Sequence, residues 1–160
     1  MVGAYHSRGV YILSQRLMLV AMALVFAVGM IAEAETTVWY VDVDSVAAPP
    51  DGASWATAFP SIQAAIDAAS GAGASEANPA EVWVAEGAYT GSGDNVVEMA
   101  EHVHLYGGFM GTETERAQRD WDASITAIDG EETRRCVLGA NSATLDGFSV
   151  TRGDAFQGGG

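Results

Sequence analysis

Three aspartates in the C-terminal half are the first candidates for chemistry. Asp129 and Asp146 each precede a glycine, in the short sequences Ile-Asp-Gly and Leu-Asp-Gly, and Asp154 lies further along. If successive turns of the chain stack, the first two carboxylates lie near each other, and calcium would relieve their repulsion through oxygen ligands. The pattern thus makes Asp129, Asp146 and Asp154 candidate Ca²⁺ ligands. Turn formation is the competing interpretation, because an aspartate side chain before glycine binds nearby backbone amides.

Trp121 is the candidate for ligand binding. It stands between Asp120 and Asp122, which favours a position on the surface, where its ring could stack against a sugar. Trp39 and Trp83 lie instead in runs of β-forming residues, and we expect them in the core.

The histidines and the cysteine give weaker indications of a functional site. His102 and His104 flank Val103, so a strand here would point both rings to one face. Such a pair can begin a transition-metal site, but no third ligand is identifiable and a solvated strand face is the better explanation. Cys136 is the single cysteine, which excludes an intramolecular disulfide framework and a multi-cysteine zinc site, and we expect it in the core.

The charge balance excludes one class of partner. The 160 residues contain 7 basic residues, all arginine, against 21 acidic ones, and the formal net charge is −14. Such a chain cannot replace the counterions around phosphates, so nucleic-acid binding is not expected. A hydrophobic content of 49% is typical of a globular protein. The acidity is explained by solubility, with calcium binding as the alternative.

The N-terminus predicts export. Arg8 and Arg16 precede an apolar run over 17–32, and the triplet Ala32-Glu33-Ala34 resembles a signal-peptidase site. Residues 1–34 therefore read as a signal peptide, with an uncleaved signal anchor as the alternative. The predicted location is secreted, periplasmic or at the cell surface of a bacterium, with membrane contact only through an uncleaved segment.

Residues 35–80 are predicted to form an N-terminal cap of one strand, a loop and one amphipathic helix. The strand is expected over 38–43, where β-forming residues dominate. Pro60 suits the first turn of a helix and Gly71 suits its end. Between them apolar residues recur at helical spacing; they are Ile62, Ala65, Ile66 and Ala69.

Residues 81–160 predict a parallel β-solenoid. Short β-rich runs, each closed by a glycine turn, recur around Trp83, Leu105, Ile128 and Leu145 at spacings of 22, 23 and 17 residues. Each coil would stack on the previous one, because one coil cannot bury its apolar face alone. A β-sandwich also uses short strands and glycine turns, but its turns usually recur at about half this spacing.

Two groups of segments carry a resemblance to a known family. The first lies at 39–42, 51–52, 54–59, 62–66 and 82–89, and the second at 105–113, 119–121, 128–130 and 145–148. Their order resembles the N-terminal part of bacterial right-handed parallel β-helix proteins of the pectin-lyase-like superfamily. The resemblance implies an all-β, right-handed parallel β-helix with a strand-helix cap, truncated after about three to four coils. Its open last coil could pair with another chain.

Function is less constrained, because this scaffold hosts lyases, hydrolases, esterases and adhesins. Lyases of this type use an arginine or lysine as base beside bound Ca²⁺, on later coils, so we predict no catalytic residue. The available arginines are Arg116, Arg119, Arg134, Arg135 and Arg152. The expected function is a non-catalytic surface module, structural or binding carbohydrate and cell-envelope components, in a fragment of a longer protein. The alternatives are the N-terminal piece of a polysaccharide lyase or glycoside hydrolase, and a calcium-stabilised adhesin fragment.

Overall fold

The computed structural model describes residues 36–154, which contain nine β-strands and one α-helix. The strands are β1 (Thr37–Val41), β2 (Ala80–Ala85), β3 (Gly87–Tyr89), β4 (Asn95–Glu98), β5 (Val103–Phe109), β6 (Thr126–Asp129), β7 (Arg135–Leu138), β8 (Thr144–Asp146) and β9 (Phe148–Thr151). The helix is α2 (Ile62–Gly71), and 3₁₀ turns lie at η1 (Trp55–Thr57) and η2 (Arg116–Gln118). Within residues 36–154 no helix is long and apolar enough to cross a membrane. The predicted signal peptide, 1–34, lies outside the described residues.

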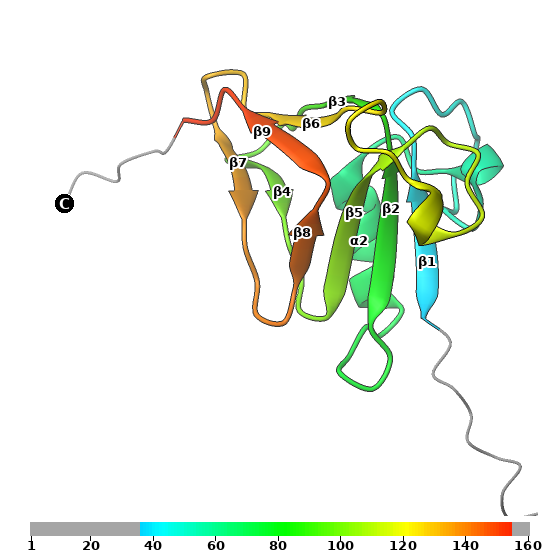
Figure 1. Ribbon diagram of the computed structural model, residues 1–160. Helices are drawn as coiled ribbons and strands as arrows, with labels where there is room; N and C mark the ends of the chain where they lie inside the picture. The colour runs from blue at the N-terminus through cyan, green and yellow to red at the C-terminus, as the bar shows by residue number, and fades with distance from the viewer. Residues whose placement is uncertain (1–35, 155–160) are drawn as a thin grey trace, which may run out of the picture. The chain divides into compact units, whose positions relative to one another are not determined.

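The nine strands form three sheets in which every strand pairing is parallel. The first sheet has the order β1-β2-β5-β8, the second β3-β6-β9 and the third β4-β7 (Figure 1). From β2 onward the chain visits the first, second and third sheets in turn, and then begins the same circuit again at β5 and at β8. The predicted all-β class is confirmed.

The predicted spacing of about 20 residues fails in one turn of the chain, the turn that contains residues 110–125. The register pairs Val82 with Leu105 and Leu105 with Leu145, so stacked positions are first 23 and then 40 residues apart. Ile128, which the sequence spacing placed after Leu105, belongs to β6 in the second sheet. The sequence spacing gave the wrong partner for Leu105 because strands of different sheets, β6 and β8, both end in an aspartate-glycine turn. A long loop between β5 and β6 also lengthens this turn of the chain.

The predicted helix is confirmed, with its start shifted. The four residues of the apolar stripe are the buried residues of α2, and they pack in the same core cluster as residues of β1, β2, β4 and β5. Ser61 is the N-cap, since its hydroxyl accepts a hydrogen bond from Ala64 N at 3.3 Å. Pro60 therefore precedes the cap instead of occupying the first turn.

One core joins the three sheets. Its buried residues come from the first sheet (Val82, Leu105), the second (Tyr89, Ile128) and the third (Val97). The inner faces of all three sheets are thus buried against one another, which is how short strands of three or four residues obtain an apolar interior.

Strands β7, β8 and β9 each lie at the end of a sheet within the described residues. Their outward edges have no strand partner in that range, and Leu138 and Val150 on them are 37% and 53% exposed. An open strand edge can pair with another strand. The pairing of this end with another chain stays a prediction.

Candidate functional site

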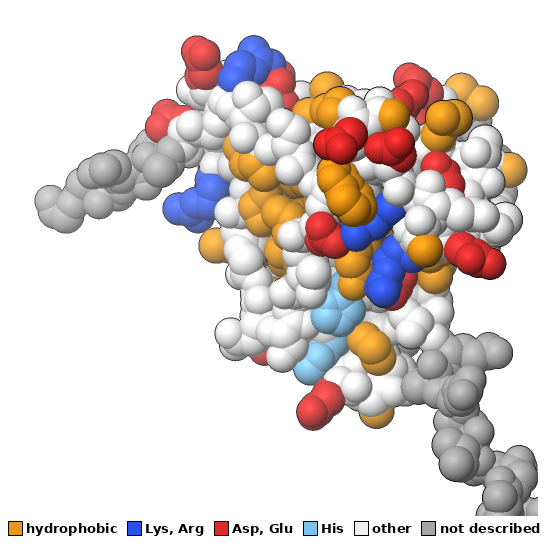
Figure 2. Space-filling model, viewed as in Figure 1, with side chains coloured by type: hydrophobic (Ala, Val, Ile, Leu, Met, Phe, Trp, Pro, Cys, Tyr) orange, Lys and Arg blue, Asp and Glu red, His pale blue; other side chains and the backbone are white. Residues whose placement is uncertain are grey.

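The outer face of the first sheet carries two rows of polar and aromatic side chains. Across β2, β5 and β8 the register aligns Glu81 with His104 and Thr144, and Trp83 with Tyr106 and Asp146. Side chains alternate between the two faces of a strand, so both rows lie opposite the buried Val82 and Leu105. Figure 2 shows arginine, acidic and apolar side chains gathered over this sheet.

Residues 110–125 form a loop whose first part is held by one carboxylate. The Glu113 side chain accepts hydrogen bonds from the backbone N–H groups of Met110, Gly111 and Thr112 at 2.7, 3.0 and 2.9 Å. Burial raises the pKa of the Glu113 carboxyl, but these hydrogen bonds outweigh it and the net direction is downward. The Glu113 carbonyl also accepts a hydrogen bond from Trp55 Nε1 at 2.9 Å, which ties the loop to η1.

The second part of the loop presents Trp121. Asp120 N donates to Gly108 O at 2.7 Å, and Asp120 Oδ1 accepts from the backbone N–H groups of Asp122 and Ala123, both at 3.1 Å. Gly108 has a φ of +89°, and a Cβ there would lie 2.8 Å from the Trp121 Cα. The backbone of Trp121 is therefore fixed against the end of β5.

Arg119 fixes the Trp121 ring and the Asp146 carboxylate together. Its guanidinium carbon lies 5.1 Å from the centre of the Trp121 ring and 5.2 Å from that of Tyr106. Its Nη2 forms an ion pair with Asp146 Oδ2, and only 12% of the Arg119 side chain is exposed. A largely buried guanidinium thus joins two aromatic rings and one acid.

Arg116 covers the same tyrosine. Its guanidinium carbon lies 4.4 Å from the centre of the Tyr106 ring, and its Nη1 pairs with Glu81 Oε1 at 2.5 Å. The other oxygen, Glu81 Oε2, accepts a hydrogen bond from Trp83 Nε1 at 2.7 Å. Burial raises the pKa of the Tyr106 phenol, and the nearby positive charge of Arg116 only partly offsets this.

A shallow pocket of about 220 Å³ opens beside Trp121, which is 54% exposed. It is smaller than the ~300–1,000 Å³ of enclosed ligand clefts, and its size suits a surface site. Its lining combines apolar, hydroxyl and carboxylate groups from the loop, β6, β8 and β9: Trp121, Ile125, Thr126, Asp146, Gly147, Phe148 and Ser149.

A larger hollow, of about 820 Å³, is lined by residues of α2 and of the segment 89–98 and is a weaker candidate. Gln63, a main polar group of its lining, donates to Asp67 Oδ1 at 2.9 Å and accepts from Glu98 N at 2.8 Å. Its amide therefore joins α2 to β4. The only aromatic residue there, Tyr89, directs its hydroxyl to Ala85 O at 3.1 Å.

The structure does not bring the three predicted calcium ligands together. Asp129 ends β6 and Asp146 ends β8, in different sheets, while Asp154 lies after β9. Their positions are not equivalent, because Asp129 pairs in register with Thr151 and Asp146 with Tyr106. Among residues 36–154 no group of three or more His, Cys, Asp and Glu side chains is placed to hold a metal ion. A calcium requirement stays a prediction.

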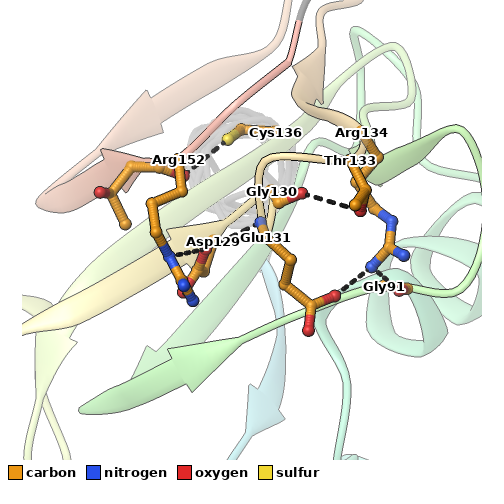
Figure 3. A network of polar contacts seen from close by, with 9 residues as sticks. Gly91, Asp129, Gly130, Glu131, Thr133, Arg134, Cys136 and Arg152 are labelled. Atoms are coloured by element: carbon orange, nitrogen blue, oxygen red, sulfur yellow. Dashed lines mark hydrogen bonds and ion pairs between the residues drawn. The ribbon is translucent and has the colours of Figure 1, made fainter.

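A polar network, called the clasp below, joins two turns of the chain through Asp129, Glu131, Arg134 and Arg152 (Figure 3). Asp129 Oδ1 accepts hydrogen bonds from Glu131 N and Arg152 Nε, both at 2.9 Å, and its Oδ2 pairs with Arg152 Nη2. The turn-forming interpretation of this aspartate is thus confirmed. Arg134 extends the network, because its guanidinium binds Glu131 and the carbonyl of Gly91.

We expect the replacement Asp129→Asn to lower Tm by a few degrees at pH 7. The hydrogen bonds from Arg152 and Glu131 lower the pKa of Asp129, so its stabilising contribution is present above the unfolded pKa of about 4. That contribution is lost as pH falls through the lower folded value. The difference from wild type should therefore shrink between pH 5 and pH 2 in thermal unfolding followed by circular dichroism.

Asp44→Asn is the control, since this exposed aspartate lies outside the clasp. An equal loss in both variants, or a loss for Asp129→Asn that does not vary with pH, would contradict the role assigned to the pair.

The remaining candidates fall at separate places. His102 precedes β5 with a φ of 60°, so the prediction that His102 and His104 lie in one strand is wrong. His104 Nδ1 lies 3.0 Å from Thr144 Oγ1. Cys136 is buried, as expected, with its Sγ 3.1 Å from Thr151 O. Four of the five candidate arginines pair with a carboxylate: Arg116, Arg119, Arg134 and Arg152.

Sequence reasoning identified Trp121 but missed the residues that hold it. Arg119 and Asp146 are 27 residues apart, and no local pattern links an exposed turn to a distant strand end. Arg116 and Arg119 both lie over the Tyr106 ring, and nothing in the sequence beyond the presence of these residue types indicated that contact.

Comparisons of this chain with protein families, curated proteins and solved structures find no match. The resemblance to pectin-lyase-like proteins therefore stays an interpretation of the residues.

Proposed function

We propose that this chain is an exported, non-catalytic carbohydrate-binding domain whose sugar platform is Trp121. The observation that carries the proposal is the exposed Trp121 ring, fixed by Arg119 and placed beside the Asp146 carboxylate in one shallow pocket. Export rests on the predicted signal peptide.

The chemistry of the pocket suits a sugar ring. The C–H face of a pyranose is apolar and packs on an indole, while its hydroxyl groups need acceptors and donors around the rim. Asp146 Oδ2 is occupied by Arg119, but the side chain is 49% exposed, so Oδ1 can accept from a hydroxyl. Ser149 supplies an exposed hydroxyl in the same lining. Because the loop is already held in place, little ordering would accompany binding.

We further propose that the three sheets are the faces of a right-handed parallel β-helix and that the described residues form successive coils of it. The repeated circuit of the chain through three parallel sheets supports this arrangement. Right-handed crossovers are the rule between parallel strands. In such a solenoid the loop at 110–125 is an insertion in one coil, and insertions on one face are common sites of binding.

The test is a binding assay with Trp121→Ala. We expect oligosaccharides to bind the wild type and to shift the backbone NMR signals of the loop, of β8 and of β9. Loss of the ring should weaken binding tenfold or more, about 1.4 kcal/mol. Folding should be unaffected, because the ring is more than half exposed.

Met110→Ala is the matched control, since Met110 is a 64% exposed apolar residue of the same loop outside the pocket. Its affinity should equal that of the wild type. Equal binding by Trp121→Ala, or no binding of any oligosaccharide by the wild type, would reject the proposed site.

A further inference from the structure

We infer that the Trp121 pocket selects uncharged glycans and discriminates against uronate-containing or sulfated ones. The inference rests on the proposed carbohydrate function and specifies its ligand class. An anionic sugar needs a cation that is free to bind its carboxylate or sulfate, whereas a neutral sugar needs acceptors for its hydroxyl groups.

The cations beside the pocket are already paired. Arg119 binds Asp146 and is only 12% exposed, with the Tyr106 and Trp121 rings beside its guanidinium. Arg116 is bound to Glu81. A glycan carboxylate would have to displace a protein carboxylate from either guanidinium, with no net gain in ion pairs.

No other arginine of the described residues lies beside this pocket. Arg134 and Arg152 belong to the clasp around Asp129. Arg135, whose Nη1 contacts Asn95 Oδ1 at 3.4 Å, lies on β7 of the third sheet. The sequence contains no lysine that could supply a mobile positive charge.

The charge that remains near Trp121 is negative. Asp120 and Asp122 flank it in sequence and are exposed, and Asp146 lines the pocket. Arg119 compensates Asp146, which leaves the two flanking aspartates in excess. At distances of about 4 Å each like charge costs roughly 1 kcal/mol in water, and salt screens it beyond about 10 Å at 0.1 M.

The sharpest test uses two ligands that differ in charge and in the ester methyl groups alone. Hexagalacturonate with every carboxylate methyl-esterified and the same hexamer with free carboxylates share linkage and ring configuration. Titration of the full chain, followed by NMR and calorimetry, should show at least tenfold weaker binding of the free acid at 20 mM salt. The difference should narrow at 500 mM salt because screening removes the repulsion. Mannohexaose and cellohexaose, which carry no charge, test whether neutral glycans other than the methyl ester also bind.

Variants separate the two roles of the carboxylates. Asp122→Asn should reduce the ratio of the affinity for the methyl ester to that for the free acid by two- to threefold. The affinity for the neutral hexamer should stay unchanged. Asp146→Asn should weaken neutral binding, because it removes the charged acceptor and the partner of Arg119.

The outcomes distinguish the inference from the proposal beneath it. Equal or tighter binding of the free acid at the Trp121 pocket would overturn the selectivity and leave the carbohydrate function standing. Binding of neither hexamer nor any neutral oligosaccharide would overturn both.

Discussion

Replacing Leu105 by alanine should destabilise the protein by about 3–5 kcal/mol, the largest loss we expect from a single truncation. Leu105 is fully buried in β5, where the register places it between Val82 and Leu145. The three side chains stack across neighbouring strands of the first sheet. Removing the middle one leaves a cavity that rigid strands on either side cannot close. Urea and thermal unfolding by circular dichroism measure the loss.

Leu138→Ala is the matched control. The chemical change is the same, but Leu138 is 37% exposed on β7, at the end of the third sheet. It should cost about 1–2 kcal/mol, since more than a third of this side chain is already in water and an open strand edge leaves no closed cavity. If both variants lost the same stability, Leu105 could not lie at the centre of a stack of strands.

The replacement Gly147→Ala should have the second largest effect, about 3 kcal/mol and roughly 10 °C in Tm. Gly147 joins β8 to β9 with a φ of +79°, in the left-handed region that alanine rarely adopts. A Cβ at this position would lie 2.6 Å from Gly107 O, a backbone atom of the neighbouring turn. The turns would have to separate, and with them the wall of the Trp121 pocket.

Two further variants locate the cause. Gly139→Ala should be neutral or slightly stabilising, because a Cβ there meets nothing within 4 Å. Gly107→Ala places a Cβ 2.5 Å from Gly147 O, so it should be as harmful as Gly147→Ala. The double variant should cost less than the two together, since one separation of the turns relieves both contacts. Full additivity would indicate two unrelated defects.

Local patterns predicted the parts whose cause is local. The apolar stripe from Ile62 to Ala69 predicted α2 because a helix brings every third and fourth residue to one side. The aspartates flanking Trp121 predicted its exposure, since charged neighbours keep a turn in water. Asp129 forms the turn that an aspartate before glycine favours.

The sheet to which each strand belongs could not be predicted in this way. Ile128 and Leu145 sit in nearly identical sequences, yet one lies in the second sheet and the other in the first. Backbone hydrogen bonds between strands do not depend on side-chain identity, so an apolar run before a glycine turn suits any sheet. The loop at 110–125 then lengthens one turn of the chain and removes the regular period.

Composition and pattern alone predict an acidic chain of short strands, one amphipathic helix and one exposed tryptophan. Only the tertiary structure decided that Arg119 meets Asp146 and Trp121, that Arg152 meets Asp129, and that the predicted calcium ligands lie apart. Ion pairs and stacked rings depend on which distant segments lie side by side in the fold. Those positions follow from the burial of a shared core.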